Sequence, residues 1–140
     1  MGIMAVEAIK KTSATRLCDD AVSIGADGRA VLIGGMCRDC GNQTFPRAPV
    51  CCVCMSETIG EQPMPRIGTL YAFSTVHVAA KKWNKPMCIG YVDLPNGARV
   101  FTHLAGATLA IGDAVEPHIG IVGEDENGAI ESFVFRKVGS

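Results

Sequence analysis

The sequence is poor in charge and in aromatic rings. Among its 140 residues only 19% are charged and 6% are aromatic, and the formal net charge is −1. A surface that binds nucleic acid needs a local excess of positive charge, which this balance does not supply. A hydrophobic fraction of 48% also argues against disorder. We therefore expect a folded chain that binds no nucleic acid.

We also expect no leader, membrane span or disulfide framework. No basic residue precedes the apolar side chains of residues 1–8, and these are too few to cross a bilayer. The seven cysteines are an odd number, and four of them have the spacing of a metal site. We expect a cytoplasmic protein that makes no contact with a membrane.

Common catalytic motifs are missing as well. The sequence contains no G-x-S-x-G, H-E-x-x-H, P-loop or G-x-G-x-x-G pattern. Cys88, His77 and His103, on neighbouring predicted strands, are the remaining candidates for a nucleophile and a base. Cysteine is often a buried structural residue, and a strand histidine is usually structural too. We predict no catalytic residue, and an independent thiol enzyme using Cys88 is the competing hypothesis.

A strong motif is nevertheless present near the middle of the chain. Cys37, Cys40, Cys51 and Cys54 form the pattern C-x2-C-x10-C-x2-C. Each C-x2-C pair aims two thiolates at one point, and Zn²⁺ binds four sulfurs tetrahedrally at about 2.3 Å with no open position. We predict a structural zinc site with these four ligands, with a rubredoxin-like iron site as the alternative.

The two C-x2-C pairs differ in the residue that follows them. Gly41 follows Cys40, where a positive φ lets backbone amides point at the sulfurs, and glycine adopts that φ freely. Met55 stands at the matching place of the second pair, which also contains Cys52. Because Cys52 would break the spacing, the predicted ligand remains Cys51.

The segment between the pairs supports the same site. Phe45, with Pro46 and Pro49, forms a stiff apolar connection, and we expect Phe45 to pack over the site. Four thiolates and one Zn²⁺ sum to −2, and Arg38 and Arg47 are close enough in sequence to offset this charge.

The remaining pattern is that of short strands. Residues 1–20 are predicted to be an arm or a short helix, residues 21–65 a hairpin and zinc ribbon, and residues 66–140 a barrel. The barrel strands are predicted at 66–80 (with both faces at least partly covered), 87–94, 98–104, 114–122 and 129–138, with a helical turn at 105–110. Residues 95–97 suggest a type I′ turn. The fold class is mainly β, with a five-stranded OB-fold barrel, and a sandwich is the alternative.

The loop before the second barrel strand carries the chain's basic cluster. Lys81, Lys82 and Lys85 flank Trp83, the only tryptophan. Ammonium groups bind phosphate and an indole stacks on a base, so this loop is a candidate contact for CoA. An exposed basic loop that anchors a partner protein explains the residues equally well.

Five segments together resemble a known family. They are LIGGMCRDCGNQTFPRAPVCCVC, RIGTLYAFSTVHV, IGYVDLPNGARVFTHL, IGDAVEP and FVFRKV, and the similarity covers residues 22–138. The chain is similar to OB-fold proteins with an N-terminal rubredoxin-like zinc ribbon that accompany acyl-CoA enzymes. Within that family it resembles the small subunits of thiolases that cleave aromatic β-oxoacyl-CoA esters, the benzoylsuccinyl-CoA thiolase type among them.

The resemblance implies a noncatalytic zinc-binding accessory subunit of a thiolase. Its thiolase-like partner would hold the nucleophilic cysteine, in a hetero-oligomer, and this chain would complete or shield the partner's CoA site. A CoA thioester would then lie at or near the interface. The alternative is a single-stranded nucleic-acid-binding protein, because OB barrels and zinc ribbons also serve that purpose.

Overall fold

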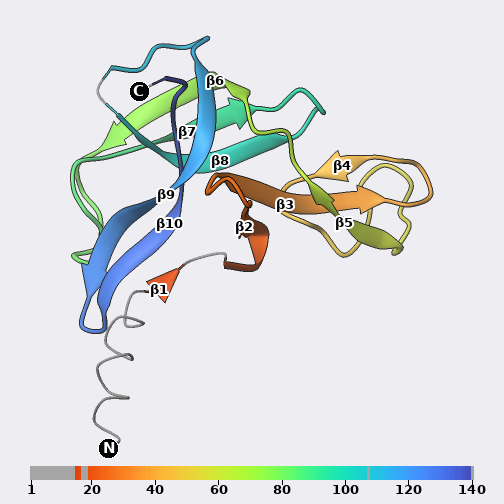
Figure 1. Cartoon of the computed structure of the whole chain (residues 1–140), viewed down its shortest axis with the longest axis horizontal. Coiled ribbons are helices and arrows are strands. Elements are labelled where there is room, and N and C mark those ends of the chain that lie inside the picture. Colours follow the sequence, from red (N-terminus) through yellow and green to blue (C-terminus); the bar gives the residue numbers. More distant parts are fainter. Residues whose placement is uncertain (1–14, 17–18, 107, 140) are drawn as a thin grey trace, which may run out of the picture.

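The computed structural model describes residues 15–16, 19–106 and 108–139 of the chain. The prediction for residues 1–14 and 17–18, an arm or a short helix, lies outside these residues. The described elements are strands and one short 3-10 helix, so the mainly β prediction is confirmed (Figure 1). Their bounds are β1 (Thr15–Arg16), η1 (Asp19–Ala21), β2 (Val22–Ile24), β3 (Ala30–Cys37), β4 (Gln43–Thr44), β5 (Ile59–Pro63), β6 (Gly68–Val76), β7 (Met87–Asp93), β8 (Arg99–Ala105), β9 (Ala114–Asp125) and β10 (Gly128–Lys137).

The five strands β6 to β10 close into a barrel. Around the barrel the order is β6-β7-β8-β10-β9, and β9 pairs again with β6. The β8–β10 pair is parallel and the other barrel pairs are antiparallel. Closure removes exposed sheet edges, and this strand order is that of an OB fold, which confirms the predicted architecture over a sandwich. The short β1 adds to β10 in parallel.

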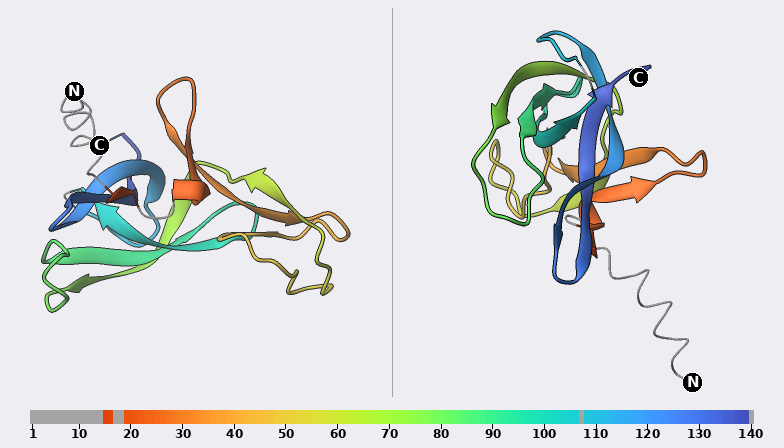
Figure 2. Two further views of the ribbon diagram at one scale, coloured as in Figure 1. Left: turned by 90° about the horizontal axis from the view of Figure 1, so that it is seen from below. Right: turned by 90° about the vertical axis from the view of Figure 1, so that its left-hand side faces the viewer.

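The strands β2 to β5 form a second, smaller sheet beside the barrel. Its central strand β3 pairs antiparallel with β2, β4 and β5. The β2–β3 hairpin predicted around residues 26–28 is present, with Gly28 at φ 81° in its turn. This sheet and the cysteine loops extend from one side of the barrel (Figures 1 and 2).

A single apolar cluster joins the two sheets. Leu32 of β3 and Met64, just after β5, are 1% and 3% exposed and belong to the same buried cluster as Val100 and Phe135 of the barrel. Burial of such side chains contributes about 1.5–3 kcal/mol each. The ribbon sheet is therefore attached through a shared core.

Two local predictions are wrong. Gly97 has φ 94° but Asn96 does not have a positive φ, and the Gly97 amide donates to the Leu94 carbonyl over 3.0 Å. This is a type I turn followed by a left-handed glycine, because the ring of Pro95 holds φ negative and excludes a type I′ turn. No helical turn follows β8 among the described residues: the strand ends at Ala105 and is followed by Gly106, whose φ is 106°.

The residues of β6 differ in burial. Gly68 and Leu70 are buried, whereas Tyr71 and Phe73 are 50% and 40% exposed. Both rings are therefore partly covered, as predicted for the two faces of this strand. A register irregularity between Leu70 and Ala72 marks a β-bulge, after which Phe73 pairs with Gly90 and points to the opposite side of the sheet from Tyr71.

Candidate metal centre and the basic loop

The structure brings the four predicted cysteines together. The sulfurs of Cys37, Cys40, Cys51 and Cys54 all lie within 4.8 Å of one another. The Cys37 and Cys54 sulfurs are 3.5 Å apart, and those of Cys40 and Cys51 are 3.6 Å apart. A disulfide would need about 2.05 Å, so these are separate thiols. Four sulfurs at about 2.3 Å from a tetrahedral centre stand about 3.8 Å apart, so the cluster fits Zn²⁺.

Each pair of cysteines belongs to a tight turn of the same shape. The Gly41 amide donates to the Cys37 carbonyl over 2.8 Å, and the Met55 amide donates to the Cys51 carbonyl over 3.0 Å. Gly41 has φ 82° and Met55 has φ 67°. Met55 is therefore held in the left-handed conformation that glycine adopts freely, and the second turn keeps the geometry of the first.

Backbone amides favour the thiolate form of Cys37 and Cys51. At Cys40 and Cys54 the amides of Asn42 and Ser56 act in the same direction, but burial and the neighbouring sulfurs outweigh them and raise the pKa. The amide of Cys40 most strongly, then that of Asp39, lowers the pKa of the Cys37 thiol to about 6 against the opposing effect of burial. The amides of Cys54 and Val53 lower the pKa of Cys51, and the Val53 nitrogen lies 3.3 Å from its sulfur. Hydrogen bonds to the charged form are the physical cause, and thiolate is the form that binds a metal.

Cys52, Arg47 and Arg38 lie near the four cysteines in sequence but each takes a different position. Cys52 is exposed and stands outside the cluster, with its sulfur 3.8 Å from the Asn42 side-chain nitrogen. Arg47 donates to the Ile59 carbonyl over 2.9 Å and pairs with Glu61 at 3.7 Å. Its guanidinium is thus engaged on the β5 side of the ribbon. Arg38 packs over Gly60, where an added Cβ would meet its guanidinium.

Phe45 does not lie over the cysteines as predicted. It packs edge to face on Phe133 of β10, with ring centroids 5.6 Å apart and an angle of 83° between the rings. Its place in the barrel's apolar cluster was missed because the sequence does not show which distant ring it meets.

The basic loop lies at the end of the barrel opposite the cysteines (Figures 1 and 2). Lys81 and Lys82 are exposed, but the indole of Trp83 is half-buried against an apolar cluster of the barrel. The Lys82 nitrogen lies 5.0 Å from the Trp83 ring centroid, and Lys85 donates to the carbonyls of Ala79 and Ala80. The indole is thus packed on the protein itself, and two of the three ammonium groups already have contacts.

The sheet register does not pair the candidate nucleophile with a candidate base. Cys88 pairs with Thr75 and Leu104, whereas His103 pairs with Ile89, and His77 follows β6 in an exposed position. Burial raises the pKa of the Cys88 thiol, which disfavours the nucleophilic thiolate.

Sequence reasoning missed a set of exposed aromatic rings on the outer barrel wall. We call them the aromatic face: Tyr71 of β6, Tyr91 of β7 and Phe101 of β8, which are 44–57% exposed. Tyr91 and Phe101 pack on each other at 5.2 Å, and the Arg99 guanidinium lies 3.7 Å above Tyr71. Tyr91 and Phe101 are direct cross-strand partners, a pairing that only the sheet register reveals.

Within the described residues, the structure has no helix of the length and hydrophobicity needed to cross a membrane.

Comparison with known proteins finds relatives that agree with one another in family. The family model described as the ChsH2 C-terminal OB-fold domain matches residues 61–120. The benzoylsuccinyl-CoA thiolase subunit BbsA of Thauera aromatica is 35% identical over 133 residues, which are 92% of each chain. The BbsA subunit of Geobacter metallireducens is 30% identical over 133 residues, 92% of this chain and 90% of that one.

More distant relatives share the fold. A DUF35 domain-containing scaffold protein of Methanocaldococcus jannaschii is 30% identical over 114 residues, 77% of this chain and 81% of that protein. Among solved structures, the Ltp2-ChsH2(DUF35) aldolase superposes with a TM-score of 0.62 at 23% identity, covering 76% of this chain and 84% of the other. The chain therefore belongs to the ChsH2/DUF35 family of OB-fold proteins, which includes the BbsA subunits of benzoylsuccinyl-CoA thiolase.

Proposed function

We propose that this chain is a noncatalytic, zinc-binding accessory subunit of a thiolase-type enzyme that processes acyl-CoA. The observation that carries the proposal is the match to BbsA over 92% of both chains, which includes the cysteine cluster as well as the barrel. The catalytic subunit supplies the nucleophilic cysteine. This chain completes or shields the CoA site of that partner.

The metal in this proposal is Zn²⁺ bound by Cys37, Cys40, Cys51 and Cys54. Four thiolates occupy all positions of a tetrahedral ion, so such a centre holds structure and leaves no position for a substrate. The sheet that carries this centre shares its core with the barrel, which supports this role, because folding of the ribbon around the metal then fixes one side of the subunit.

The aromatic face supports the presence of a protein partner. Three neighbouring exposed rings are unusual on a surface that stays in water, and aromatic side chains are enriched in protein interfaces. We propose that the catalytic subunit covers this face. Lys81 and Lys82 are the proposed contacts for phosphate groups of CoA, because their ammonium groups are exposed and their positive charge suits phosphate. Trp83 and Lys85 are also part of this proposed contact, because they shape the loop that carries Lys81 and Lys82.

The test is reconstitution with a thiolase-like protein from the same organism as the candidate catalytic subunit. The two chains are co-expressed, and complex formation and thiolysis are measured with and without the present chain. We expect a stable complex and loss of most activity when this chain is omitted. A thiolase-like protein that is fully active alone and does not bind this chain would refute the proposal.

Surface variants locate the contact. Replacing Tyr91 and Phe101 together by Ser should weaken the complex at least about tenfold, as loss of buried aromatic anchors does. Val78→Ser is the matched control, because Val78 is 89% exposed and lies outside the aromatic face. Equal effects of the two changes would rule out the aromatic face as the interface. The subunit assignment would then still be decided by the activity measurement.

The nucleic-acid alternative has one supporting observation. OB barrels that bind single strands stack bases on exposed aromatic rings, and Tyr91 and Phe101 are such rings. Binding of that kind depends steeply on salt because counterions are released. Titration with a single-stranded oligonucleotide at two salt concentrations separates the hypotheses, and we expect no salt-sensitive binding.

A further inference from the structure

The loop at residues 79–86 folds back over the barrel wall and is held there by its backbone. The Asn84 amide donates to the Val122 carbonyl over 3.0 Å, and the Glu124 amide donates to the Lys82 carbonyl over 2.7 Å. Between them, a Cβ added to Gly123 would stand 2.1 Å from the Lys82 oxygen. Only glycine permits this approach, so the position of the loop depends on Gly123.

The side chains of the loop complete an apolar layer on the outside of the barrel. Trp83 packs against the cluster of Val122, Ile130 and Val134. Its ring lies 6.2 Å from that of His103, at an angle of 41°. The only tryptophan of the chain is thus next to the strand that carries His103.

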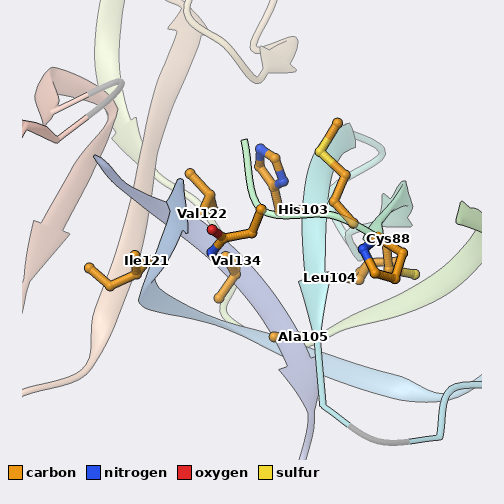
Figure 3. Close-up of a pocket in the computed structure, with 10 residues that line it drawn as sticks. Cys88, His103, Leu104, Ala105, Ile121, Val122 and Val134 are labelled. Carbon is orange, nitrogen blue, oxygen red and sulfur yellow. The ribbon is translucent and has the colours of Figure 1, made fainter. Parts of the chain in front are cut away.

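A cavity of about 160 Å³ lies between this loop and the barrel. Its walls come from the loop and from strands β7, β8, β9 and β10 (Figure 3). A dry cavity of about 150 Å³ accommodates one benzene ring, so this space has the size of a single six-membered ring. The lining residues are Asn84, Pro86, Met87, Cys88, His103, Leu104, Ala105, Ile121, Val122 and Val134.

The lining carries polar groups but no charged side chain. Asn84 contributes an amide, Cys88 a thiol and His103 an imidazole, and the other lining residues are apolar. Burial lowers the pKa of His103 and raises the pKa of Cys88, so both side chains are neutral near pH 7. A charged ligand would lose its hydration here without gaining a partner of opposite charge.

We propose that the cavity under the loop at residues 79–86 binds a small neutral aromatic ring that carries one hydrogen-bonding substituent. The ring lies against Ala105, Val122 and Val134, and the substituent reaches Asn84 or His103. This assignment goes beyond the proposed function, because it needs neither the catalytic subunit nor CoA.

The experiment uses the full chain, purified with its metal, and benzyl alcohol as the probe. Trp83 reports binding by its fluorescence, because it packs against the cluster that contains Val122 and Val134, and these two residues also line the cavity. We expect a saturable fluorescence change with a Kd of about 1 mM or tighter for a ligand of this size. Benzoate and benzylammonium, which have similar shape and carry charge, should bind at least about tenfold more weakly.

A second measurement follows alkylation of single cysteines by peptide mass spectrometry. Bound benzyl alcohol should slow the alkylation of Cys88 several-fold and leave that of Cys52, which is exposed and far from the cavity, unchanged. This measurement needs no substitution and therefore does not depend on a variant folding.

A substitution that fills the cavity provides the matched variant. Ala105→Leu places additional carbon atoms in the cavity and should abolish both signals, whereas Ala26→Leu, in the exposed β2–β3 turn, should change neither. The proposal is overturned if the fluorescence change does not saturate, if the charged and neutral probes bind equally, or if Cys88 gains no protection in the unmodified chain.

Discussion

Phe45 from the ribbon segment and Phe133 in the barrel form an edge-to-face pair, with centroids 5.6 Å apart. Nearby, the Asn96 side-chain nitrogen donates to the Gln43 side-chain oxygen over 2.8 Å. The metal ribbon is thus held to the barrel by an aromatic pair within the shared core and by a hydrogen bond beside it. We therefore expect loss of this junction to lower the stability of the fold.

Phe45→Ala should lower the free energy of unfolding by about 2 kcal/mol. Loss of a core phenylalanine costs about 3–5 kcal/mol, and Phe45 is only partly buried. The measurement is chemical denaturation of the metal-loaded protein. Phe101→Ala is the control, because Phe101 is 57% exposed and should cost well under about 1 kcal/mol in the isolated chain. Equal losses for the two variants would contradict a structural junction at Phe45.

The purified chain should contain about one zinc ion, and Cys40→Ser should reduce this content strongly. Removal of one of four thiolates weakens a structural zinc site, and the ribbon then loses the binding energy that folds it. Elemental analysis and circular dichroism measure the two effects. Cys52→Ser should retain the metal because the Cys52 sulfur lies outside the cluster. Dependence of the metal content on Cys52 would mean that the ligand set is wrong.

Met55→Gly should stabilise the protein slightly, by up to about 1 kcal/mol. A non-glycine residue at φ 67° costs about 1–2 kcal/mol, and the greater freedom of glycine in the unfolded chain offsets part of the gain. Met55 is 72% exposed, so little packing is lost. The reciprocal change, Gly41→Ala, should destabilise by about 1 kcal/mol. Thermal unfolding at constant zinc concentration measures both, and changes of the same sign would refute the explanation.

Glu116→Gln should cost about 1–3 kcal/mol of unfolding free energy. Glu116 pairs with Arg66 at 3.1 Å, and both side chains are largely withdrawn from water, with 17% and 21% exposed. The substitution leaves a partly buried guanidinium without its counter-charge. Asp93→Asn breaks the more exposed pair with Arg99 and should cost less than about 1 kcal/mol. Denaturant midpoints compare the two, and a larger loss for Asp93→Asn would disprove the ranking.

His103 should make the protein less stable in mild acid. Burial lowers the pKa of His103 in the folded state below its ordinary value of 6.5, so the unfolded chain takes up a proton first as the pH falls. The contribution is fully present above about pH 6.5 and is lost as the pH falls through the folded pKa. Thermal unfolding between about pH 7.5 and 5 measures it, since His residues titrate in this range. The slope should flatten in His103→Gln.

His77→Gln is the control for this pH dependence, because His77 is exposed after β6. Acid also protonates the cysteines, so the informative quantity is the difference between each variant and the unmodified protein at the same pH. Identical slopes in the two histidine variants would show that His103 does not contribute.

Local features were predictable from the sequence. The spacing of Cys37, Cys40, Cys51 and Cys54 is enough to gather four sulfurs, because a C-x2-C turn fixes two thiols within a few bonds of backbone. The strand periodicity located the barrel strands to within a few residues for the same reason: the alternation of side chains is a property of one strand alone. The type I′ prediction at residues 95–97 failed where a single proline overrode the pattern.

Only the tertiary structure decided which distant segments meet. The alternation within a strand does not name its neighbour, so the parallel β8–β10 pair and the aromatic face could not be read from the sequence. Likewise, nothing local indicates that the loop bearing Trp83 reaches Gly123, some forty residues away, and lines a half-open cavity. The proposed metal ligands and the strands follow from local sequence patterns, because they depend on short-range geometry. The surfaces emerge on folding, because they depend on contacts between residues far apart in the chain.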